Sequence, residues 1–261
     1  MLRRRRLLTA APLALLAGCA TSFYEDDAPT APPHLHMQNP GLQPPPGALM
    51  IDARALAPGD ILLSAANGAT SLGIRLMTLS AVSHASLYIG DAQVAEAVGE
   101  GIRRRSVAEL VDEESTVVAF RHPGVRPENV AKMQAFVAET VGEKYNYVGV
   151  LLQAPFSIER KMCEMPLTPS LVRDFCVQGV GAMQLGLGRS DRFFCSQFVL
   201  EAYRRAGLPL TTADPRLLSP ADLLHMREGD VPSVHSFQAL QYVGHLKYQP
   251  VTGTAASAAG A

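Results

Sequence analysis

Several short stretches of the chain are rich in β-branched and other apolar residues and are bounded by turn residues, a pattern typical of β-strands. It predicts strands over residues 60–64, 83–90, 93–98, 117–121 and 241–248. The turn Pro58-Gly59 precedes the first strand, and a turn beginning at Gly90 separates the second strand from the third. Such short connections favour antiparallel pairing of neighbouring strands.

Elsewhere, apolar residues recur at helical spacing. The predicted helices cover residues 69–79, 106–112, 127–142, a segment that starts at Thr168, 195–206 and 220–227. Ser106 and Glu109 have the spacing of a capping box, Pro127 occupies a first helical turn, and Gly207 ends the fifth helix. Because strands and helices do not alternate strictly, the pattern predicts a mixed α+β domain.

The first residues have the pattern of an export signal. Arginines at positions 3–6 precede an apolar stretch, Leu7–Leu16, that is too short to span a bilayer. The following Leu16-Ala17-Gly18-Cys19 resembles the lipobox of bacterial lipoproteins, in which the chain is cut before the cysteine and the thiol carries a diacylglycerol. We therefore expect removal of residues 1–18 and a lipid on Cys19; the alternative is an ordinary secretory signal. By the same resemblance, Ala20 favours the outer membrane, facing the periplasm.

Composition divides the remaining chain into a tether, a folded region and a tail. Residues 19–48 contain seven prolines and little apolar periodicity, which is typical of an extended tether that would follow the lipidated Cys19. Residues 49–250 carry the predicted elements and form one domain. Residues 251–261 are small and polar, and we expect a disordered tail there.

The overall composition excludes some classes of function. The 261 residues are 48% hydrophobic and 18% charged, which rules out wholesale disorder. A net charge of −1 argues against a nucleic-acid partner, and the run Arg103–Arg105 is interpreted as a solvated edge. Glycine-rich nucleotide-binding motifs do not occur in the sequence, and we predict neither a metal site nor a cofactor. The oligomeric state stays open.

Cys195 is the candidate nucleophile. It begins a predicted helix, where unpaired backbone N–H groups and a nearby imidazolium would lower the pKa of a thiol and make it reactive. The alternative is core packing, because Phe198, Val199 and Ala202 lie on the same predicted helix face. Spacing alone leaves both interpretations open.

His84 is the candidate base and Glu96 the group that would orient its ring. Alternate strand residues share a face. With a three-residue turn, Gly90-Asp91-Ala92, His84 and Glu96 become diagonal neighbours on one face, whereas a two-residue turn would put them on opposite faces. The alternatives are a structural strand histidine and an exposed strand carboxylate.

Four blocks of sequence resemble a known family: Pro58-Gly-Asp-Ile-Leu-Leu63, Ser83-His-Ala-Ser-Leu-Tyr-Ile-Gly90, Val94-Ala-Glu-Ala97 and Phe194-Cys-Ser-Gln-Phe-Val-Leu-Glu-Ala-Tyr203. They are similar to the permuted papain-like amidases of the NlpC cell-wall hydrolase superfamily, of the YaeF/YiiX type, in which the histidine precedes the cysteine.

This resemblance implies a circularly permuted papain-like fold, with a small antiparallel sheet packed against helices that include the nucleophile helix. It also implies a Cys195 nucleophile, a His84 base, Glu96 as the third member, and no cofactor. Gly142-Glu-Lys-Tyr145-Asn146 resembles a Gly-x-x-Tyr-Asp stretch of the family, with Asn in place of Asp. Tyr145 and Ser196 are candidates for substrate or oxyanion support.

Two features stay open at this level. Cys163 and Cys176 can form a disulfide in an oxidising compartment or remain core thiols. The function is expected to be hydrolysis of an amide, in a peptidoglycan peptide or another substrate. The alternatives are a lipid acyltransferase or esterase of the lecithin:retinol acyltransferase-like type, and a binding module without activity.

Overall fold

A computed structural model describes most of the region expected to fold. The described residues are 21–24, 34–37, 41–42, 47–66, 71, 80–143, 163, 172, 175–177, 194–228, 234 and 236–248. The predicted signal peptide with Cys19, the predicted tail and Tyr145 lie outside them. The helices expected over 69–79 and from Thr168 fall mostly outside them too.

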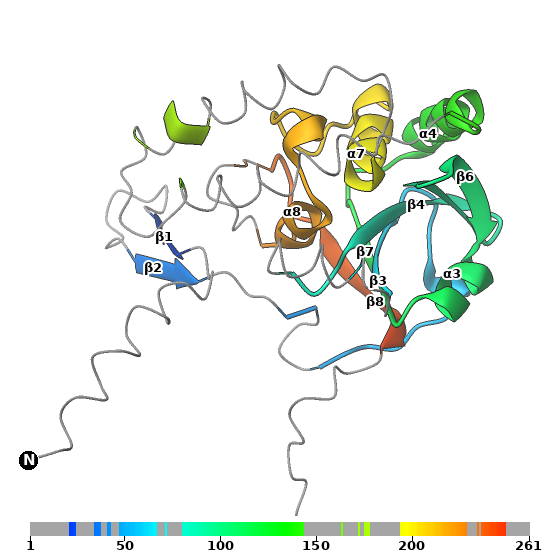
Figure 1. Ribbon diagram of the computed structural model, residues 1–261, viewed down its shortest axis with the longest axis horizontal. Coiled ribbons are helices and arrows are strands. Elements are labelled where there is room, and N and C mark those ends of the chain that lie inside the picture. The colour runs from blue at the N-terminus through cyan, green and yellow to red at the C-terminus, as the bar shows by residue number, and fades with distance from the viewer. Residues whose placement is uncertain are drawn as a thin grey trace, which may run out of the picture.

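A six-stranded antiparallel sheet forms the centre of the domain (Figure 1), with the strand order β6-β5-β4-β3-β7-β8. The strands are β3 (Ile61–Ala65), β4 (His84–Gly90), β5 (Gln93–Val98), β6 (Gly101–Ser106), β7 (Thr116–Arg121) and β8 (Gln241–Tyr248). Five of them confirm strands predicted from the sequence. The sixth, β6, was not predicted, because its polar run of three arginines lacks the apolar residues that mark a strand.

The described helices confirm the α+β class. They are α3 (Val107–Glu113), α4 (Pro127–Thr140), α7 (Cys195–Arg205) and α8 (Pro220–His225), with short 3-10 turns η1 (Ala53–Ala55) and η2 (Pro215–Leu217). The predicted capping box is present in α3, where the Ser106 hydroxyl accepts from the Glu109 N–H and the Glu109 carboxylate accepts from Ser106. Among the described residues, no helix has the length and apolarity that crossing a membrane requires.

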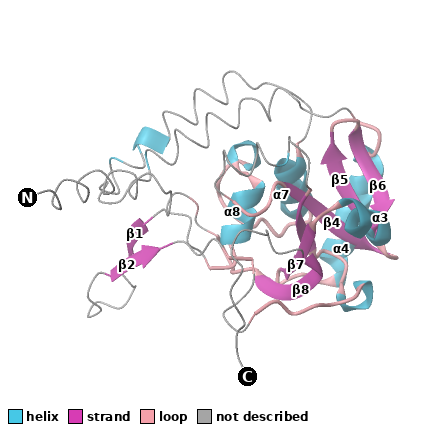
Figure 2. Cartoon of the chain, turned by 60° about the horizontal axis from the view of Figure 1, so that its bottom comes forward, coloured by secondary structure: helices cyan, strands magenta, loops and turns pink. Residues whose placement is uncertain are grey.

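The sheet separates two apolar clusters, as the strand period of two requires. Leu62, Tyr88 and Val94 pack with α3 on one face. Ile61, Leu87 and Ala95 face the other side and pack with residues of α4, α7 and α8. Figure 2 shows α3 and the α7–α8 pair on different sides of the strands. The helix that begins with Cys195 is therefore fixed directly against the sheet.

The hairpin between β4 and β5 differs from the expected one. Asp91 and Ala92 form a two-residue turn, with φ values of 51° and 54°, and Gly90 pairs with Gln93. The predicted three-residue turn is wrong. A β-bulge at Ile89 then shifts the register by one residue, so that Leu87 pairs with Ala95. The bulge compensates for the shorter turn, and His84 and Glu96 share one face.

The motif Pro58-Gly59-Asp60 joins the nucleophile helix to the sheet. Gly59 has a φ of +97°, which favours glycine, and its carbonyl accepts a hydrogen bond from the hydroxyl of Tyr203 in α7. The buried Asp60 carboxylate accepts from Arg121 of β7 at 2.7 Å and from the Ala57 N–H at 2.8 Å. These contacts hold the residues before β3 against the end of β7 and against helix α7.

The region expected to be a tether contains two strands. β1 (Thr21–Tyr24) and β2 (His34–Met37) pair with each other in an antiparallel register, apart from the six-stranded sheet. Leu42 is buried in the cluster that includes α7 residues. The described residues of this region therefore include β structure and a core contact that the proline content did not indicate.

Candidate active site

Cys195 is the first residue of α7, as the sequence predicts. Phe194 precedes the helix in an extended conformation and provides no side-chain cap, so the first backbone N–H groups of the helix lack a partner from it. Such N–H groups stabilise a negative charge at a helix start. The Cys195 side chain is buried, and it is the one free cysteine in the described part of the chain.

His84 is brought to Cys195 because it begins β4, which packs against α7. Its Nε2 lies 2.9 Å from Oε2 of Glu96, and the ring also interacts with the Cys195 side chain. Burial disfavours a charged ring, but the hydrogen bonds with Cys195 and Glu96 outweigh this effect and raise the pKa of His84 from 6.5 to about 10. The geometry therefore favours an imidazolium next to the sulfur.

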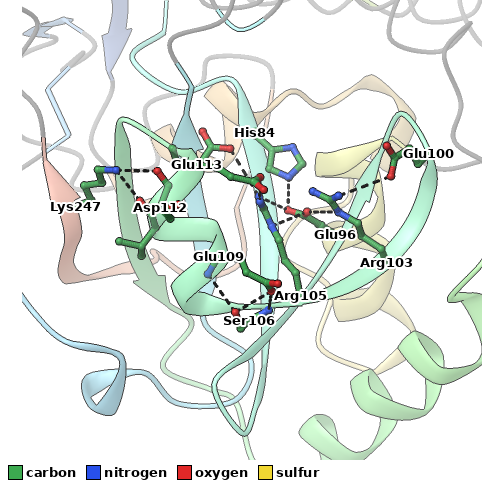
Figure 3. Close-up of polar contacts among 12 residues, drawn as sticks. His84, Glu96, Glu100, Arg103, Arg105, Ser106, Glu109, Asp112, Glu113 and Lys247 are labelled. Carbon is green, nitrogen blue, oxygen red and sulfur yellow. Dashed lines mark hydrogen bonds and ion pairs between the residues drawn. The ribbon is translucent and has the colours of Figure 1, made fainter.

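Glu96 of β5 is completely buried, and its carboxylate is surrounded by cationic groups (Figure 3). Oε1 accepts from Nε of Arg103 at 2.9 Å, and Oε2 accepts from a terminal nitrogen of Arg105 at 3.1 Å as well as facing His84. Burial alone would raise the pKa of this carboxyl. The hydrogen bond and charge of His84, with those of the two arginines, lower it to about 2.

The arginine run is a correction to the sequence interpretation. Arg104 is exposed, but Arg103 and Arg105 lie on the opposite side of β6 and bind Glu96. The Arg105 side chain is only 7% exposed. The predicted solvated edge is thus wrong for these two residues, because alternation along an unrecognised strand turns them inward.

Two further carboxylates reach the same cluster from the end of α3. A terminal nitrogen of Arg105 donates to Glu113, and the other lies 3.8 Å from Glu114. Burial raises the pKa of Glu114, and its Oε2 has no hydrogen-bond partner among the described residues. Glu113 and Glu114 were not singled out in the sequence. The sequence signal that could have indicated them is that they end the helix that directly follows β6, the strand that carries arginines at alternate positions.

The other candidate residues are distributed as follows. The buried Ser196 hydroxyl donates to the Leu218 carbonyl at 2.6 Å, so it holds η2 against α7 instead of facing Cys195. Cys163 and Cys176 are joined by a disulfide, with their Cα atoms 5.7 Å apart. Tyr145 and Cys19 lie outside the described residues. Within the described ranges, no three His, Cys, Asp or Glu side chains are grouped so that they could hold a metal ion.

A cavity of about 510 Å³ extends along α7, starting two residues after Cys195. Gln197, Glu201 and Arg204 line it from the helix, and residues 209–216 close it from the other side. Arg204 is paired with Glu201 and Arg216 with Asp214, each at 2.6–2.7 Å. The walls therefore combine charge-compensated polar residues with apolar ones such as Leu200, Pro209 and Leu210.

The cluster has the chemistry of an activated thiol. A sulfur at a helix start, an imidazole that interacts with it and a buried carboxylate bound to the ring are the kinds of group that nucleophilic catalysis by a thiol uses. The carboxylate fixes the ring orientation and favours its charged form. The backbone N–H groups at the start of α7 are candidates for binding an oxyanion.

Comparison with known proteins gives one substantial match. No protein-family model matches the chain. The chain is 40% identical over 200 residues to a protein of Escherichia coli strain K12 named "Probable lipoprotein peptidase YaeF", and the match covers 76% of this chain and 73% of that protein. The crystal structure of metalloprotein YiiX from Escherichia coli O157:H7 is similar at 17% identity and a TM-score of 0.42, and covers 74% of this chain and 98% of that chain.

Proposed function

The chain belongs to the family of the probable lipoprotein peptidase YaeF, and on this premise we propose that it is a cysteine hydrolase that cleaves amide bonds. The identity confirms the resemblance to the YaeF/YiiX type that four sequence blocks indicated. The observation that carries the proposal is the contact of His84 with both Cys195 and Glu96 at the start of helix α7. A cysteine peptidase uses this arrangement of nucleophile, base and orienting group.

The proposed reaction has two acyl-transfer steps. The Cys195 thiolate attacks the amide carbonyl and forms a C–S bond, while the carbonyl oxygen gains negative charge near the first N–H groups of α7. His84 gives its proton to the leaving amine as the C–N bond breaks. The now neutral His84 takes a proton from water, which attacks the thioester and releases a carboxylic acid and the thiolate. Glu96 keeps the ring oriented through both steps.

A circularly permuted papain-like fold accommodates this order of groups. The histidine and the carboxylate come from β4 and β5, and the nucleophile helix follows much later in the chain. We infer that the sheet and α7 correspond to the core of the NlpC-type hydrolases in a different chain order. The α+β architecture with one six-stranded antiparallel sheet is consistent with this inference.

The similarity to a probable lipoprotein peptidase favours a peptide-like substrate over an acyl chain. An acyltransferase or esterase of the lecithin:retinol acyltransferase-like type would need an apolar slot for its acyl chain beside Cys195. The close contact of His84 with Cys195 disfavours a binding module without activity. A peptidoglycan peptide is the substrate we favour.

The proposed site of action is the bacterial envelope. A relative named as a lipoprotein peptidase supports a lipid on Cys19 after removal of residues 1–18. The lipid would hold the enzyme on the membrane, in the outer membrane and facing the periplasm, with residues 19–48 as the connection to the domain at 49–250. Palmitate labelling that is lost in Cys19→Ala would support the anchor, and equal labelling of both proteins would contradict it.

Trapping the acyl-enzyme tests the proposed chemistry. Full-length protein is incubated with a peptidoglycan digest, quenched in acid and analysed by mass spectrometry, with Cys195→Ala as the control. We expect an acyl adduct on Cys195 in the wild type and none in the control. In parallel, iodoacetamide should alkylate Cys195 faster at about pH 7 in the wild type than in His84→Ala. Equal alkylation rates in the two proteins together with no adduct would refute the proposal.

A further inference from the structure

The carboxylate that orients His84 is itself held by a buried arginine. Nε of Arg105 lies 2.8 Å from Oε1 of Glu96, and one terminal nitrogen donates to Oε2 at 3.1 Å. The guanidinium therefore faces both carboxylate oxygens, with one hydrogen bond to Oε2 and a close ion pair to Oε1 that lacks hydrogen-bond geometry. Because the Arg105 side chain is only 7% exposed, water screens this contact weakly.

Arg105 also connects Glu96 to a different element. Its remaining terminal nitrogen donates to Glu113 near the end of α3 (Figure 3). Glu114 lies 3.8 Å from the nitrogen that binds Glu96. The capping box at Ser106 fixes the start of α3 directly after Arg105 in the chain. The guanidinium is thus held on one side by Glu96 of β5 and on the other by Glu113 of α3.

We propose that Arg105 is a positioning residue that sets the geometry and the charge balance of the Cys195–His84–Glu96 relay. This inference rests on the proposed function and extends it to a residue that does not touch the reacting atoms. Its positive charge offsets the buried carboxylate, so that the thiolate forms next to a site of smaller net negative charge. Without it, Glu96 and the thiolate would repel each other across the imidazolium.

The three consecutive arginines provide a matched experiment. Arg105→Met removes the buried charge and keeps much of the apolar volume. Arg104→Met is the control, since Arg104 lies on the same strand but is exposed on the other side. The measurement is the rate of iodoacetamide alkylation of Cys195 against pH, with thermal melting as the test of folding. We expect Arg105→Met to move the inflection up by about one pH unit and to lower the rate below the inflection about tenfold, with Arg104→Met unchanged.

A second variant keeps the test decisive. Arg105→Lys retains the charge but has one ammonium group in place of the planar fork, so it cannot face Glu96 and Glu113 together. We expect a smaller upward shift than in Arg105→Met. A folded Arg105→Met protein with the wild-type inflection would overturn the proposal, and so would a wild-type profile in Arg105→Lys if Arg105→Met does not fold. Equal alkylation rates in the wild type and His84→Ala, together with no adduct, are a different result, which would refute the proposed function.

Discussion

Two histidines on the same sheet, one partly and one fully buried, have opposite electrostatic environments. His84 at the start of β4 contacts the Glu96 carboxylate, and its pKa rises to about 10 despite burial. His245 of β8 is fully buried, and burial lowers its pKa to about 4. Its Nδ1 lies 2.6 Å from the Tyr242 hydroxyl, and its Nε2 has no hydrogen-bond partner within the described ranges.

The difference shows that the partner of a buried imidazole decides its charge. A carboxylate can repay the desolvation of an imidazolium, whereas a hydroxyl cannot supply a full opposite charge. A protonated His245 would also carry an unpaired N–H at Nε2. His84 is therefore suited to proton transfer, and His245 is suited to packing as a neutral group between β7 and the segment at Met50.

The largest expected effect comes from removing the charged histidine. His84→Ala takes away the proposed base, which would form the thiolate and protonate the leaving amine, and we expect turnover to fall by about 10³-fold or more. The measurement is acyl-adduct formation or amide hydrolysis by the purified variant. His245→Asn serves as the control and should keep wild-type turnover. Equal losses in both variants would remove the functional distinction between the two histidines.

A smaller effect is expected when only the partner is changed. Glu96→Gln keeps the shape of the side chain but removes its charge, so His84 would have a neutral neighbour at this position, as His245 has in Tyr242. We expect turnover to fall about 10²-fold and the alkylation inflection of Cys195 to move to higher pH.

The control for this variant is Glu100→Gln. Glu100 lies in the turn between β5 and β6 and 3.8 Å from Arg103, but its side chain is 87% exposed. It should leave both the turnover and the inflection unchanged. Wild-type kinetics in Glu96→Gln would mean that another polar group orients His84.

The sequence was sufficient for the local elements and for the positions of Cys195, His84 and Glu96 within them. Helix α7, with Cys195 at its start, was predicted from its apolar spacing and from Gly207 at its end. The capping box of α3 was predicted from the spacing of Ser106 and Glu109. These features depend on interactions between near neighbours in the chain. The contact of His84 with Glu96 was also expected, although for a turn that the structure does not contain.

The remaining features depend on register and on contacts between distant elements. The bulge at Ile89 has no marker in the sequence, and it changes which residues share a face. The inward direction of Arg103 and Arg105 depends on the pairing of β6 with β5. In that register Arg103 lies opposite Glu96, and Arg105 lies on the same face. The contact of Arg105 with Glu113 further requires α3 to fold back beside this strand.

The last prediction tests the neutral histidine through stability. Below pH 6.5 the unfolded chain binds a proton at residue 245, whereas folded His245 stays neutral down to about pH 4. The unfolded state then holds more protons, so the free energy of unfolding decreases as the pH falls through this window, by at most about 1.4 kcal/mol per pH unit. His84 has the opposite sign, since its raised pKa adds stability below pH 6.5 that is lost as the pH rises toward 10.

His245→Asn should therefore flatten the acid side of the stability curve. The Asn carbonyl can still accept from the Tyr242 hydroxyl, while the titrating ring is gone. We expect urea denaturation at pH 8, 6.5 and 4.5 to show a smaller loss of stability toward pH 4.5 in the variant than in the wild type. At pH 8 residue 245 is neutral in both states, so the pH 8 value measures the packing cost of the substitution alone. Parallel curves for the two proteins would show that His245 is not the acid-sensitive group, and the contrast with His84 would then rest on the active-site measurements only.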